Sequence, residues 1–143
     1  MLRQLFFCMM LVSFCNTGLA VEKHIRISNK TSGELEVSHF AKFNISDLPD
    51  QIDVPHSSST TEFFHVDHNV TTLELIIKVV KSNYFISNYK DDACRITAHL
   101  HLDDEPPLMH AIVISLTDTN QYRCKILNND TILVEEPNDL FFN

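Results

Sequence analysis

Glycine is scarce in this sequence. Only two of its 143 residues are glycines, and Gly18 lies in an apolar leader, which leaves Gly33 for the rest of the chain. The turns must therefore rely on Asn, Asp, Ser and Pro, which form turns by local hydrogen bonding or by restricting φ.

Long apolar runs are also absent. The run from Leu5 to Phe14 has ten residues, whereas a membrane-spanning helix needs about 20. Arg3 precedes this run and the small residues Gly18 and Ala20 follow it, which is typical of a secretory signal peptide. We expect residues 1–20 to be a cleaved signal and residues 21–143 to form one secreted domain without a transmembrane segment. The domain would be extracellular, or periplasmic in a bacterium.

Basic residues are few. Without the leader the chain keeps ten Lys and Arg against nineteen Asp and Glu, a net charge of −9. Nucleic acids and anionic membranes are bound through basic patches, so this balance argues against both as partners. An extracellular protein or a glycan is the partner class that we expect.

Cysteine is nearly absent once the leader is removed. Only Cys94 and Cys124 remain, an even number in an oxidising compartment. We predict one disulfide between them, closing a loop of about 30 residues.

Short runs rich in Thr, Val, Ile, Phe and Tyr fill the rest of the chain, separated by turn-forming residues. They predict an all-β fold, an antiparallel β-sandwich or small barrel of about eight strands. Residues 128–130, Asn-Asn-Asp, should form the bend of a hairpin. Residues 71–80 also fit an amphipathic helix, but their β-branched content favours a strand. Residues 48–61 should cross from one sheet to the other.

Residues 93–102, ACRITAHLHL, show the clearest period-two pattern. Apolar residues occupy the even positions from Cys94 to Leu102, and polar residues occupy Arg95, Thr97, His99 and His101 between them. In a strand these two sets face opposite sides. We therefore expect His99 and His101 to share the solvent face.

The string His99-x-His101-x-x-x-Glu105 resembles the first motif of the cupin family, whose members are small β-barrels. The resemblance implies that these three residues would bind a metal ion, and imidazole ligands suit zinc or copper. The alternative is that the histidines are exposed strand residues and that residues 103–107 form a charged turn, which requires no cofactor.

The neighbouring strand bears on this choice. Ile112, Ile114 and Leu116 should face the core, which places His110 opposite Leu100 and away from His101. Shifting the pairing by one residue would unite the histidines but expose the isoleucines. We therefore favour exposed histidines without a metal.

Four Asn-x-Ser/Thr triplets occur in the predicted mature chain, at Asn29, Asn44, Asn69 and Asn129. In a eukaryotic or viral host they would be glycan acceptors on the surface, and in a bacterium they would be turn formers.

These patterns favour an exported, non-enzymatic binding or interaction module of unknown ligand, because no convincing catalytic group is present. The first alternative is a cupin-like metal-binding protein or metalloenzyme. The second is a structural or accessory secreted glycoprotein.

Overall fold

The computed structural model of the chain describes residues 20–41, 45–67, 71–83, 86–101, 108, 110–116 and 121–137. Strands are the only regular secondary structure in these ranges. The described residues therefore contain no helix that is long and apolar enough to cross a membrane. The strands are β1 (Val21–Lys30), β2 (Glu34–Ala41), β3 (Ile45–Ser46), β4 (Gln51–Val54), β5 (Ser59–Val66), β6 (Thr71–Asn83), β7 (Ile86–Leu100), β8 (Ile112–Ser115), β9 (Arg123–Leu127) and β10 (Thr131–Glu135).

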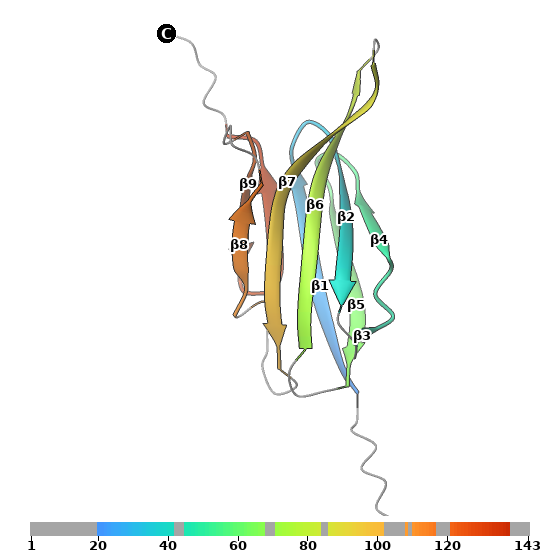
Figure 1. The fold of residues 1–143 in the computed structure, drawn as a ribbon, viewed down its shortest axis with the longest axis vertical. Helices are drawn as coiled ribbons and strands as arrows, with labels where there is room; N and C mark the ends of the chain where they lie inside the picture. Colours follow the sequence, from blue (N-terminus) through green and yellow to red (C-terminus); the bar gives the residue numbers. More distant parts are fainter. Residues whose placement is uncertain are drawn as a thin grey trace, which may run out of the picture.

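The strands form two five-stranded sheets that pack face to face (Figure 1). Sheet A has the order β3-β5-β1-β10-β9, and sheet B has the order β4-β2-β6-β7-β8. Neighbouring strands are antiparallel except for β1 and β10, which pair in parallel. The predicted all-β sandwich is confirmed, with two more strands than the expected eight.

Alternating side chains build the core between the sheets. On β1, Ile25 and Ile27 are buried while Arg26 is exposed, and on β6 each odd-numbered residue from Thr71 to Val79 is buried. This alternation of two confirms the strand prediction for residues 71–80, since a helix would bury residues at intervals of three and four. Apolar side chains from both sheets meet in one core cluster.

Two segments differ from the sequence prediction. Residues 86–100 form the single long strand β7, which begins well before the period-two segment 93–102 on which the strand was predicted. Residues 48–61 do carry the chain between sheets, but they include β4 in sheet B and the start of β5 in sheet A. The chain therefore crosses twice, from β3 of sheet A to β4 of sheet B at residues 47–50 and back to β5 of sheet A at residues 55–58.

Asp, Ser and Asn residues adopt positive φ in the turns, and asparagines form the predicted β9–β10 bend. Asn128 and Asn129 have φ values of 51° and 55°, the left-handed conformation that a type I′ hairpin turn requires at both central positions. Gly33 is required for a different reason, because a Cβ atom there would lie 2.6 Å from the carbonyl oxygen of Val80. The backbone of β6 passes too close to admit a side chain.

Candidate functional site

The predicted histidine site lies at the C-terminal end of β7. Ile96, Ala98 and Leu100 are buried and His99 is exposed on the outer face of sheet B, as the period-two pattern predicted. The Thr72 hydroxyl lies 3.3 Å from Nδ1 of His99. His101 follows the end of the strand and is half-buried.

The pairing of β7 with β8 differs from the prediction by one residue. Thr97 lies opposite Ile112 and Arg95 lies opposite Ile114, so both isoleucines face solvent, with 59% and 49% of their surface exposed. The expectation that they face the core is wrong.

Leu108 gives the physical reason for this shift. Its side chain is buried in the core, its backbone N–H donates to the carbonyl of Asn129, and its own carbonyl accepts from Ala111. The chain is therefore anchored four residues before β8 begins. From this anchor, Val113 pairs with the buried Ile96.

The shift brings two histidines together. The rings of His101 and His110 have centroids 5.9 Å apart, so the predicted separation of these residues is also wrong. Glu105 lies outside the described residues. Among those that are described, no three His, Cys, Asp or Glu side chains form a group that could hold a metal ion. Because Glu105 is not among the described residues, the ligand set that the cupin resemblance implies stays a prediction.

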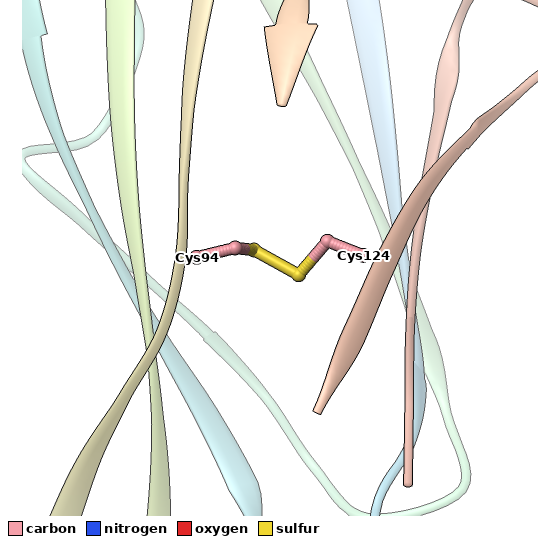
Figure 2. Close-up of a disulfide and its surroundings, with 2 residues drawn as sticks. All are labelled: Cys94 and Cys124. Atoms are coloured by element: carbon pink, nitrogen blue, oxygen red, sulfur yellow. A yellow bond between two sulfur atoms is a disulfide. The ribbon is translucent and has the colours of Figure 1, made fainter. Parts of the chain in front are cut away.

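The predicted disulfide is confirmed. Cys94 of β7 and Cys124 of β9 are bonded, with Cα atoms 6.5 Å apart and 30 residues of sequence separation. Figure 2 shows the bond running from one strand to the other. It joins sheet B to sheet A beside the β8 and β9 edges.

The sequence triplets fall in contrasting environments. Asn129 is exposed in the β9–β10 turn, and Asn44 and Asn69 lie outside the described residues. Asn29 is 1% exposed, and its Nδ2 atom donates to the carbonyls of Gly33, Val54 and Pro55 at 2.8–3.1 Å. The nitrogen that would carry a glycan is therefore enclosed by backbone carbonyls, whereas the same atom of Asn129 lies in an exposed turn. Glycosylation at these positions stays a prediction.

Asn29 has a structural role. Its Oδ1 atom accepts hydrogen bonds from the backbone N–H and the hydroxyl of Thr31, at 2.9 and 2.8 Å. One amide thereby fixes the β1–β2 turn and ties β1 of sheet A to the end of β4 in sheet B. The sequence could not reveal this, because residues 54 and 55 are distant from residue 29 along the chain.

A half-buried ion pair stabilises the end of β10. Nζ of Lys81 lies 2.6 Å from Oε1 of Glu136, and Ser32 donates to the same carboxylate through its hydroxyl and N–H groups. Burial alone would raise the pKa of Glu136, but the hydrogen bonds from Lys81 and Ser32 outweigh it and lower the pKa. Burial also raises the pKa of Tyr122, whose ring lies under the Lys81 ammonium at 5.5 Å.

A groove on the outer face of sheet A was not predicted. It has a volume of about 530 Å³ and lies between β1 and the turn that leads into β5. Its lining residues are polar or charged: Arg26, Ser28, Asn29, Lys30, Ser57, Ser58 and Ser59. The alternation in β1 indicated that Arg26 and Ser28 are exposed, but only the pairing of β1 with β5 brings the serine run beside them.

A second groove adjoins the first and shares Arg26. It has a volume of about 360 Å³ and is lined further by His24, Thr61, Phe63, Asn128, Asp130 and Thr131. Nε2 of His24 lies 3.4 Å from the Asp130 carboxylate, and the ring of His24 contacts that of the exposed Phe63. Polar and aromatic side chains thus extend along the outer face of sheet A.

Comparisons with known proteins do not assign a family. No protein-family model, curated protein or solved structure matches the chain. The fold and the geometry of its surfaces are therefore the observations on which a function is proposed.

Proposed function

We propose that the chain is an exported, non-enzymatic interaction module in which the edge strand β8 receives an extended segment of a partner protein. The observation that carries this proposal is the exposure of Ile112 and Ile114 on the last strand of sheet B. Strand addition at a free sheet edge is a common mode of peptide recognition, with affinity from main-chain hydrogen bonds.

The backbone of β8 supports this mode. The N–H of Leu116 donates to the carbonyl of Ala93 on β7. Because residues in an antiparallel strand alternate in the side to which their N–H and C=O groups point, those of Val113 and Ser115 point away from β7. Within the described ranges β8 pairs with β7 alone, so these groups are available to another strand.

The side chains add an apolar contribution. Ile112 and Ile114 lie on one face of β8, beside Thr97 and Arg95 of β7. Covering them would gain about 25 cal/mol for each Å² of apolar surface removed from water. Arg95, held 3.0 Å from the carboxylate of Glu74, supplies a polar border to this surface.

Photo-cross-linking tests the proposal. A cross-linkable side chain is placed at Ile112 or, as the control, at Phe40, which is 59% exposed on β2 of the same sheet. In extracellular fluid of the producing organism we expect a discrete cross-linked partner from position 112 alone. Ser115→Pro should abolish it, since proline removes an outward N–H and leaves the β7–β8 bonds intact.

Two outcomes would reject the proposal. The first is the same products from positions 112 and 40, which indicates non-specific contact. The second is a partner captured equally by the folded Ser115→Pro variant, which would mean that strand addition is not the mode of binding.

A further inference from the structure

The outer face of sheet A combines positive charge with hydroxyl groups on a protein that is acidic as a whole. Arg26 and Lys30 are exposed on β1, with the half-buried Ser28 between them. The groove that they line is closed on its other side by the serines of residues 57–59. This surface is separate from β8, which belongs to the other sheet.

Arg26 and Lys30 differ from the other basic residues of the described chain. Five basic side chains form ion pairs with carboxylates: Lys78, Lys81, Lys90, Arg95 and Lys125. Lys23 and Arg123 also have interaction partners. In the parts of the chain that the structure describes, neither Arg26 nor Lys30 forms an ion pair with a carboxylate.

The acidic residues near this pair have other partners. Asp130 lies in the adjoining groove that shares Arg26, and its carboxylate lies 3.4 Å from Nε2 of His24. Glu135 lies opposite Lys30 in the β1–β10 ladder, but its carboxylate is paired with Lys125. Carboxylates outnumber basic groups almost two to one in the chain without its leader. Two neighbouring cations that have no carboxylate partner among the described residues are therefore not a simple result of composition.

The geometry of the groove suits a group with several acceptor oxygens. Arg26 and Lys30 are four residues apart on one strand, so their Cα atoms are about 13 Å apart and their long side chains can converge over Ser28. The hydroxyl of Ser59 donates to that of Ser28 at 3.1 Å, which places two hydroxyl groups between the cations. A guanidinium group matches the paired oxygens of sulfate and phosphate.

We propose that this groove binds a tetrahedral oxyanion, a sulfate or phosphate group that is either free or an ester of a larger ligand. Arg26 and Lys30 supply the charge, and the serine hydroxyls supply neutral hydrogen bonds. The net charge of the chain, −8 with its leader and −9 without it, repels long polyanions, so the site is suited to a compact anionic group and not to a nucleic acid.

Titration calorimetry in low-salt buffer tests the site, because salt screens exposed charges. The probes are inorganic sulfate, inorganic phosphate, glycerol phosphate and a sulfated heparin hexasaccharide, which separate free ions from esters. The test variant is Arg26→Gln/Lys30→Gln. The matched control, Lys78→Gln/Lys90→Gln, changes the net charge equally but removes cations that are already paired on sheet B.

We expect the natural protein and the control to bind at least one probe with similar affinity, and the test variant to bind about tenfold more weakly or worse. The test variant should keep its melting temperature, because the substituted side chains are exposed. Absence of binding to all four probes would overturn the proposal. An equal loss in both double variants would also overturn it, because net charge and not the groove would then explain the binding.

Discussion

Replacing Asn29 with aspartate changes one amide nitrogen into an oxygen with almost no change in shape. Nδ2 of Asn29 donates to three carbonyl oxygens, those of Gly33, Val54 and Pro55, and the side chain is 1% exposed. An aspartate oxygen in this position would donate nothing and would face the same three acceptors. The variant therefore tests whether this one amide holds the end of β4 against β1.

The size of the effect follows from these contacts. The two N–H bonds of the amide are shared among three acceptors, so their loss costs about 2 kcal/mol. The buried negative charge would face the same carbonyl oxygens and keep only the two Thr31 donors, which adds to this loss. We expect Asn29→Asp to lower the free energy of unfolding by about 3–5 kcal/mol at pH 7, a large part of the roughly 5–15 kcal/mol of a typical domain.

Urea denaturation followed by circular dichroism measures this difference. The control is Asn129→Asp, which makes the same change in the exposed β9–β10 turn and should cost less than about 1 kcal/mol. At pH 4 the deficit of Asn29→Asp relative to the natural protein should narrow, because a protonated carboxyl group can again donate one hydrogen bond. A variant within about 0.5 kcal/mol of the natural protein at pH 7 would refute the reasoning.

Three further predictions concern stability, each measured as the free energy of unfolding. Cys94→Ala/Cys124→Ala should lose about 3–4 kcal/mol, since the bond closes a 30-residue separation, and a loss below about 1 kcal/mol would contradict this. Glu136→Gln should be less stable than the natural protein at pH 7. The pKa of Glu136 is lowered from 4.5, so its contribution to stability is present above pH 4.5 and is lost as the pH falls through the lowered pKa. The free energies of unfolding of the two proteins should therefore converge in acid. A deficit that does not change with pH would argue against the Lys81 pair. Finally, His39→Leu should gain about 1–2 kcal/mol, because both ring nitrogens of His39 are buried and have no hydrogen-bond partner in the described structure. A loss of stability would show that the ring nitrogens do have hydrogen-bond partners.

The sequence was most informative where one strand alone carries the signal. Ile96, Leu100 and His99 lie on the faces that the alternation of residues 93–102 predicted, and the asparagines at 128 and 129 form the predicted bend. The cysteine pair was predictable because only one pairing was possible after removal of the leader.

The candidate sites were less predictable. Arg26 and the serines of residues 57–59 are some 30 residues apart in the chain and meet only because β1 pairs with β5. Asn29 belongs to a surface glycosylation motif by sequence, yet the end of β4 encloses it. In both cases the residues that surround the side chain come from distant parts of the sequence, so the local sequence does not predict its environment.

The sequence by itself determined the strand character of the chain, the inner and outer faces of β7 and the disulfide pair, because the pleat of a strand converts a period of two directly into two faces. Only the tertiary structure decided the register of β7 against β8, which exposed Ile112 and Ile114 and brought His110 to His101. A shift of one residue turns every side chain of a strand to the other face. Here that choice depended on the anchoring of Leu108 in the core and on its hydrogen bond to Asn129, a contact with a turn of the opposite sheet that no local pattern specifies.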